Sequence, residues 1–310
     1  MFDIVGKRYW YFGLSALVVI PGLIALALFG LPLAIDFTGG SLLQLEFDQP
    51  VNVSTAKIKE IYASHDPDLA DALVQTSGDR GLLIRSKQIG DTELKNAIEE
   101  DIRQEYGDFT ELRFESIGPS VGAQVANRAT EAVALAAVGI LLYIAWAFRH
   151  VPKPFRYAVC AIVAMLHDVA VVVGLAAILG HFLGWEVDAL FLTALLTVIG
   201  FSVHDSIVVF DRIRENLGRH RGEPFEDVVN HSIIQTLDRS INTQLTVLFT
   251  LTALTLFGGV TIRHFVIWLL IGILSGTYSS IFNASPLLVA WENGELTGWL
   301  RRLRGQQVPA

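Results

Sequence analysis

The sequence predicts a polytopic α-helical membrane protein with six transmembrane helices and one α+β, ferredoxin-like external domain. Of the 310 residues, 52% are hydrophobic and only 17% are charged, with a mean hydropathy of +0.47, whereas an ordinary soluble domain is about 25% charged. Six apolar runs punctuate the chain. Between the first two, residues 34–127 carry 17 acidic against 8 basic side chains. This polar block is therefore a water-soluble domain and not a nucleic-acid surface.

The first apolar run, residues 11–31, follows Lys7 and Arg8 in the manner of a signal peptide. Because it is longer than the apolar core of a signal peptide and precedes a poor cleavage site, we interpret residues 1–33 as an uncleaved transmembrane anchor. A motif with paired glycines follows, for which a simple turn is the local interpretation: Asp36, Phe37, Thr38, Gly39 and Gly40.

Residues 41–117 alternate between strand and helix patterns in the order β-α-β-β-α-β, which is that of a ferredoxin-like sandwich. The last strand covers residues 109–117. We expect His65 to lie in a solvated loop, because no catalytic or metal-binding cluster surrounds it. A linker that is rigid at Pro119 and free at Gly118 and Gly122 then leads to the membrane.

The second half of the chain holds the remaining five apolar runs, so residues 128–292 predict a five-helix transmembrane bundle, followed by a basic tail at 293–310. The runs cover residues 132–148, 157–179, 189–210, 241–257 and 265–289. A separate amphipathic helix at the membrane interface is expected just after residue 224. In the last run, Gly272 and Gly276 have the spacing of a close helix contact, and we consider them a candidate face for a partner subunit.

The basic residues predict the orientation of these helices. Loops 149–156 and 211–239 are basic, whereas loops 180–188 and 258–264 together contain a single lysine or arginine, Arg263. The positive-inside rule therefore places both termini in the cytoplasm and residues 34–127 outside. The basic residues after residue 211 are Arg212, Arg214, Arg219, Arg221 and Arg239, and those of the tail are Arg301, Arg302 and Arg304.

Four ionisable residues stand out in or beside the bundle: Asp168, His204, Asp205 and Arg239. Asp205 precedes Asp211 by six residues and so lies roughly 9 Å inside its helix end. A carboxylate there costs about 2.5–3.5 kcal/mol, and its default interpretation is functional. The alternatives stay open: Asp205 can join helices through hydrogen bonds, and Arg239 can be a snorkelling anchor. No spacing of metal ligands or of a nucleophile and base occurs in the spans.

Four motifs, in order, resemble those of the SecF family of bacterial protein-export membrane proteins. The most specific is residues 201–216, FSVHDSIVVFDRIREN; the others are residues 35–40, 118–122 and 239–243. The motifs bracket residues 35–243, and the six-span pattern covers nearly the whole chain. His204 departs from the family, which more often has Asn there, and it could add a second titratable group.

The resemblance implies one half of a resistance-nodulation-division (RND) type membrane fold in a bacterial cytoplasmic membrane. It implies a SecD-like subunit and a YajC-like small membrane protein as partners, together with membrane lipid. The function implied is to help the SecYEG channel export preprotein, with a proton gradient as energy source and without cofactor, metal or enzymatic activity. Asp205 and Arg239 then correspond to the proton path, with Asp168 and His204 as further candidates.

The two glycine motifs flank the external domain, and we expect them to act as hinges, with static turns at the lipid surface as the alternative. Two other functions remain as alternatives. An independent proton-driven exporter of small molecules or lipids would need a second half or a self-dimer. An intramembrane hydrolase would need a positioned nucleophile, and Ser202 and Ser206 have no partner that spacing identifies.

Overall fold

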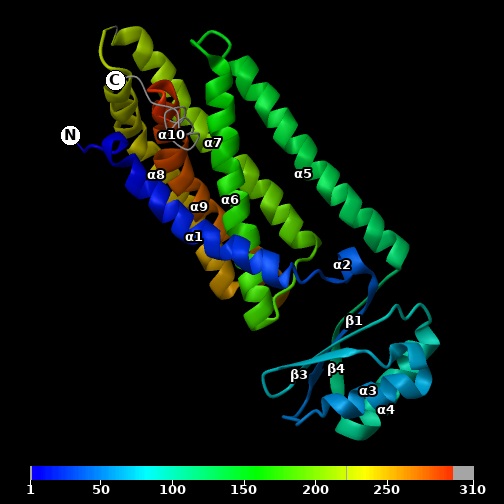
Figure 1. Ribbon diagram of the computed structural model, residues 1–310. Coiled ribbons are helices and arrows are strands. Elements are labelled where there is room, and N and C mark those ends of the chain that lie inside the picture. Colours follow the sequence, from blue (N-terminus) through cyan, green and yellow to red (C-terminus); the bar gives the residue numbers. More distant parts are fainter. Residues whose placement is uncertain (1, 221, 296–310) are drawn as a thin grey trace. The chain divides into compact units, whose positions relative to one another are not determined.

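The computed structural model describes residues 2–220 and 222–295, which divide into two compact units (Figure 1). One unit is Leu33–Glu131, and the other joins the chain up to Pro32 with the chain from Ala132 onward. Predictions that involve Arg221 or the basic tail at Arg301, Arg302 and Arg304 lie outside the described residues.

The unit Leu33–Glu131 is an antiparallel four-stranded sheet in the order β2-β3-β1-β4, with α3 and α4 against one face. This order and the β-α-β-β-α-β sequence confirm the ferredoxin-like prediction. Alternate residues of β1, including Leu45 and Phe47, face Ile58 of α3 and Ile102 of α4 in a shared core. The elements are α2 Ile35–Thr38, β1 Gly40–Phe47, α3 Thr55–His65, η2 Pro67–Leu69, β2 Leu73–Ser77, β3 Gly81–Ser86, α4 Thr92–Tyr106 and β4 Phe109–Ile117.

The residues at which the chain enters and leaves this sheet are paired with each other. Gly40, the first residue of β1, is the antiparallel register partner of Ile117, the last residue of β4. Only Gly118 separates β4 from α5, which begins at Pro119. The predicted freedom of the linker at Gly122 is therefore wrong, because the chain is helical from Pro119 onward. Proline is well tolerated at the first helical position, because the missing N–H would have no partner there.

His65 ends α3 and does not lie in a loop, so that prediction is also wrong. Its Nε2 lies 2.8 Å from Oδ2 of Asp101 on α4. The contact joins the two helices that cover the sheet. A short sequence window cannot show it, because the partners are 36 residues apart.

Six helices of the described chain are long and apolar enough to span a membrane, which confirms the predicted number. Pro21 lies inside the first without ending it. The long elements are α1 Arg8–Phe29, α5 Pro119–Ala147, α6 Pro154–Leu183, α7 Ala189–Arg219, α8 Phe225–Phe257 and α9 Val260–Ser279. The π-helical segment Ser280–Ala284 and then α10, Ser285–Glu292, extend α9. The short η1, Val5–Lys7, precedes α1.

Helix α8 corrects the prediction of two separate helices. The expected interfacial helix and the fifth span form one continuous helix of 33 residues. No glycine or proline interrupts residues 225–257, so nothing in the backbone forces a break. Arg239, which the prediction placed at the cytoplasmic end of the fifth span, is exposed on the side of α8.

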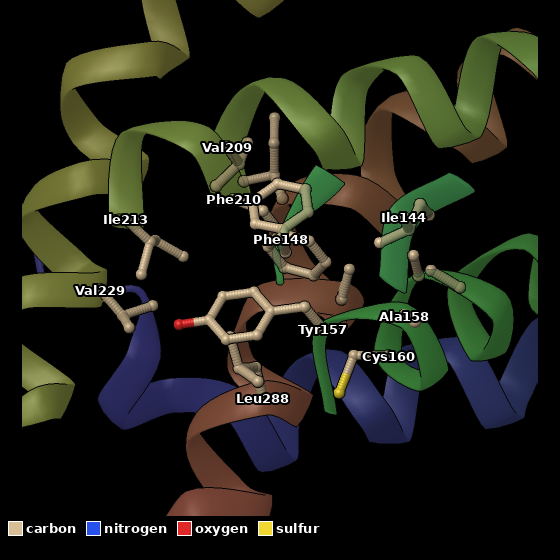
Figure 2. Packing of buried hydrophobic residues seen from close by; sticks show 14 of the residues in the cluster. Ile144, Phe148, Tyr157, Ala158, Cys160, Val209, Phe210, Ile213, Val229 and Leu288 are labelled. Atoms are coloured by element: carbon tan, nitrogen blue, oxygen red, sulfur yellow. The ribbon is translucent and has the colours of Figure 1, made fainter. Parts of the chain in front are cut away.

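Aromatic packing closes the bundle where α5, α6 and α7 meet (Figure 2). The ring of Phe148, just after α5, stacks on Tyr157 of α6 at 5.6 Å between centroids, and Phe210 of α7 meets Tyr157 edge-on at 5.3 Å. Val229 and Leu288 complete the packing around Tyr157. The contact fixes the end of α7, whose middle carries the candidate site.

Candidate functional site

Two carboxylates are enclosed near the middle of the membrane-length helices, Asp168 on α6 and Asp205 on α7. Their exposed fractions are 0% and 3%. A carboxylate removed from water requires hydrogen-bond donors or protonation, because burial disfavours the charge. The donors around each residue therefore determine what each can do.

Asp168 is surrounded by hydroxyl groups. Ser202 of α7 donates its Oγ–H to Oδ2 over 2.5 Å, and Ser279 of α9 donates to the same oxygen over 2.6 Å. Ser275 of α9 donates to Oδ1 over 2.6 Å, and Nδ1 of His167 lies 3.0 Å from Oδ1. Hydrogen bonds to an ionised acceptor are the strong ones. The set ties α6, α7 and α9 together.

Close packing of α9 on α7 brings these serines to Asp168. A Cβ on Gly276 would lie 3.3 Å from Cα of Ser202, and one on Gly272 would lie 2.1 Å from Cγ2 of Val198. The spacing correctly predicts a close helix contact. The prediction that this glycine face contacts a partner subunit is wrong, because α7 of the same chain packs against it.

Asp205 has a different environment. Nε2 of Gln244 on α8 donates to its Oδ2. Nδ1 of its neighbour His204 lies 3.6 Å from Oδ1, but the His204 side chain is 65% exposed and points out of the bundle. Asp205 thus has one firm donor where Asp168 has three hydroxyls, and it lies beside a face that the described part of the chain leaves exposed.

Arg239 does not pair with Asp205 in the described part of the chain. It is exposed on α8 and precedes Gln244 by five residues, about 7.5 Å along the helix axis. The pairing of Arg239 with Asp205 therefore stays a prediction about another state of the protein. The structure places Gln244 where the prediction expected the guanidinium.

The two carboxylates are linked through α7. Ser202, which binds Asp168, precedes Asp205 by three residues, so both lie on one face of the helix. The next residue, Ser206, is fully buried, and its hydroxyl has no partner in the described structure. A polar layer thus runs from α9 through Asp168 and α7 to Gln244 on α8.

Several residues of this layer were not predicted. Ser202 was noted only as a nucleophile without a partner, and Gln244 was not among the candidate residues. Ser275 and Ser279 are spaced i, i+4, which puts them on one helix face, but nothing local identifies Asp168 as their target. Residues 2–220 and 222–295 contain no group of three or more His, Cys, Asp or Glu side chains that could hold a metal ion.

The glycine motifs that flank the external unit pack against each other. A Cβ on Gly39 would lie 2.6 Å from Cα of Pro119, and one on Gly122 would lie 2.6 Å from the backbone nitrogen of Gly39. Gly39 and Gly40 have φ of +74° and +123°, which favour glycine. The motifs form one packed junction beside an open cavity of about 330 Å³ that Asp66, Asp68, Lys87 and Gln88 help to line.

Six membrane-length helices, an enclosed pair of carboxylates and an inserted split βαβ unit define a polytopic membrane protein with ionisable groups in its core. The C-terminal domain of the protein export membrane proteins SecD and SecF matches residues 97–294, and the SecD/SecF GG motif matches residues 24–51. The chain belongs to the SecD/SecF family.

Relatives and a solved structure agree with this family. The protein translocase subunit SecF of Anaerolinea thermophila is 53% identical over 304 residues, which cover 97% of this chain and 98% of that protein. The protein translocase subunit SecDF of Bacillus subtilis is 34% identical over 301 residues. The match covers 95% of this chain but only 38% of the SecDF chain. The crystal structure of SecDF from Thermus thermophilus, a translocon-associated membrane protein, superimposes with a TM-score of 0.80 at 33% identity, over 94% of this chain and 39% of that chain.

Proposed function

We propose that this chain acts as the SecF-type subunit of a SecDF-like complex that uses the proton motive force to assist SecYEG-dependent export of preprotein. The observation that carries the proposal is Asp205: a carboxyl enclosed in the middle of α7, with one amide donor, next to a face that residues 2–220 and 222–295 leave exposed. Such a group can exist in both protonation states, whereas three hydroxyl groups of α7 and α9 bind Asp168 and hold it between the helices.

A SecD-like subunit is the expected partner for that face. Thr193, Gly200 and His204 are exposed along α7, at spacings that put them on one side of the helix. Lipid is a poor neighbour for an imidazole, since ionisable groups in membranes normally face protein or a water-filled cavity. The SecDF relatives support this partner, because this chain matches only part of their single chain. SecYEG, a YajC-like small protein, preprotein and lipid complete the proposed surroundings.

Arg239 gives a physical route to proton release. A guanidinium that approaches Asp205 favours the ionised carboxylate, and its departure favours the protonated form. Motion of α8 that brings Arg239 toward Asp205 would therefore unload the proton. One charge crossing 100 mV is worth about 2.3 kcal/mol, enough to bias a conformational cycle. His204 would share or modulate this step, and Asp168 would hold the helices in place.

The external domain would use this cycle to act on preprotein outside the cytoplasmic membrane, with both termini in the cytoplasm. The junction of Gly39, Pro119 and Gly122 is the proposed hinge. Because its two motifs pack on each other, they would move as one joint. Hinges are typically a few residues at element ends, which is where these residues lie.

The test is export of preprotein into membrane vesicles that contain the complex, with and without a proton gradient. Asp205→Asn keeps the shape but cannot ionise, so gradient-stimulated export should be lost while basal export remains. Asp211→Asn is the matched control, because Asp211 is an exposed acid six residues further along α7. Gradient-stimulated export that persists in Asp205→Asn, or is lost only in Asp168→Asn, would contradict the assignment of Asp205.

A further inference from the structure

In the side-chain amide of Gln244, the nitrogen has a hydrogen-bond partner, whereas the oxygen has none in the described structure. Gln244 is 3% exposed and lies on α8. Its Nε2 donates to Oδ2 of Asp205, while its Oε1 is buried and has no partner in the described structure. A buried acceptor without a donor is uncommon in folded proteins and calls for an explanation.

The chemistry of the two side chains supplies one. An ionised carboxylate only accepts hydrogen bonds, whereas a protonated carboxyl has one O–H to donate. A glutamine amide offers donors at Nε2 and an acceptor at Oε1. Rotation of the amide by about 180° exchanges these atoms, so the same residue can complement either protonation state of Asp205.

We propose that Gln244 is a positioning residue that transmits the protonation state of Asp205 to helix α8. The inference rests on the proposed function, in which Asp205 gains and loses the proton. In the ionised state, Nε2 makes a charge-assisted bond that holds α8 against α7. In the protonated state, the amide turns, Oε1 accepts the carboxyl O–H, and the bond between the helices becomes a weaker neutral one. Arg239, on the same helix, is then freer to move.

The other charged or titratable groups near Asp205 do not supply this link. His204 lies on α7 itself and points outward, so it cannot join α7 to α8. From α6, Asp168 is engaged by serine hydroxyls, and α9 contributes Ser275 and Ser279 to Asp168. On α8, Arg239 has no described contact with Asp205. Gln244 is therefore the described side chain that bonds α8 to this carboxyl.

The test combines infrared difference spectroscopy with an export assay. The sample is the complex of this chain with its SecD-type partner in lipid vesicles, and its glutamine residues carry an isotope label at the side-chain carbonyl. Spectra are compared between proton-loaded and unloaded conditions. A glutamine carbonyl band that is absent in Gln244→Met should move to lower frequency on proton loading, because the carbonyl then accepts a hydrogen bond. In Asp205→Asn this movement should disappear. The movement itself is measured on the unsubstituted chain, and the two variants serve only to assign the band and its cause.

Export separates this inference from the proposed function. Gln244→Met keeps the side-chain length without hydrogen-bonding groups, and should lower gradient-stimulated export at least tenfold while basal export remains. Thr250→Val is the matched control on α8, because the Thr250 hydroxyl bonds only within its own helix. An unmoved glutamine band, or full stimulation in Gln244→Met, overturns the role of Gln244 even if Asp205→Asn abolishes stimulation. Stimulation that persists in Asp205→Asn overturns the proposed function itself.

Discussion

Asp168 and Asp205 are enclosed to nearly the same degree in the same bundle, yet their surroundings differ in kind. Asp168 receives hydroxyl groups from α7 and α9 and an imidazole contact from its own helix. Asp205 receives one amide from α8 and lies beside an outward-facing histidine. Burial alone therefore does not distinguish a structural carboxylate from one that can exchange a proton. Under the proposed function, the number of donors and access from a partner face make the distinction.

The comparison predicts that Asp168 contributes far more to stability than Asp205 does. Asp168→Ala should lower the free energy of unfolding by on the order of 3 kcal/mol, because three hydroxyls lose a charged acceptor. Asp205→Ala should cost about 1 kcal/mol or less, since one amide loses its partner. Denaturant unfolding in mild detergent measures both. Equal losses would remove the distinction between the two sites.

Single serine substitutions sharpen the same comparison. Ser202→Ala and Ser279→Ala each remove one hydrogen bond to Asp168, and each should cost about 1.5–3 kcal/mol. Thr255→Ala is a suitable control, because the Thr255 hydroxyl bonds only to Leu251 of its own helix. Losses no larger than in the control would mean that these hydroxyls do not support the carboxylate.

The packing that assembles the Asp168 site can be tested at Gly272. Gly272→Ala places a methyl group 2.1 Å from Val198 Cγ2, so α9 must move away from α7, at a cost of about 1–3 kcal/mol. Val198→Ala in the same chain should restore part of the loss. Gly200→Ala, which would meet no atom within 4 Å, should be neutral or slightly stabilising. A destabilisation that Val198→Ala does not relieve would point to a different cause.

The smallest expected effect on stability is at His204. His204→Asn should change the free energy of unfolding by less than about 0.5 kcal/mol, because the side chain is largely exposed. The pH dependence of gradient-stimulated export should change, since an ionisable imidazole beside Asp205 is replaced by an amide that cannot ionise. An unaltered pH profile would show that His204 takes no part in the proton step.

Local sequence patterns predicted the external unit better than the bundle site. Alternating apolar residues identified the strands, and β4 covers residues 109–117 as expected. The two-residue alternation of a strand is complete within a few residues, so a short window of sequence is enough to predict it. The predicted linker failed at Pro119, where a residue that usually interrupts helices begins one.

In the bundle, the number of spans followed from hydropathy, but the partners of the carboxylates did not. Ser202, Ser275 and Ser279 lie 34, 107 and 111 residues from Asp168 in sequence. Serine is common in apolar helices, so no periodic pattern marks its target. The spacing of Gly272 and Gly276 predicted a close helix contact, but spacing carries no information about which helix fills the contact.

The pairing of Gly40 with Ile117 has a mechanical consequence. Both strands that connect the external domain to the rest of the chain begin or end at this pair, so tension on the two connections runs along β1 and β4 in the same direction. These strands then bear the load together and do not slide past each other. The shear falls on the next ladder, from Ser41↔Ser86 to Glu46↔Gly81. Its hydrogen bonds lie across the strands and resist together, so the sheet would withstand such tension without unravelling.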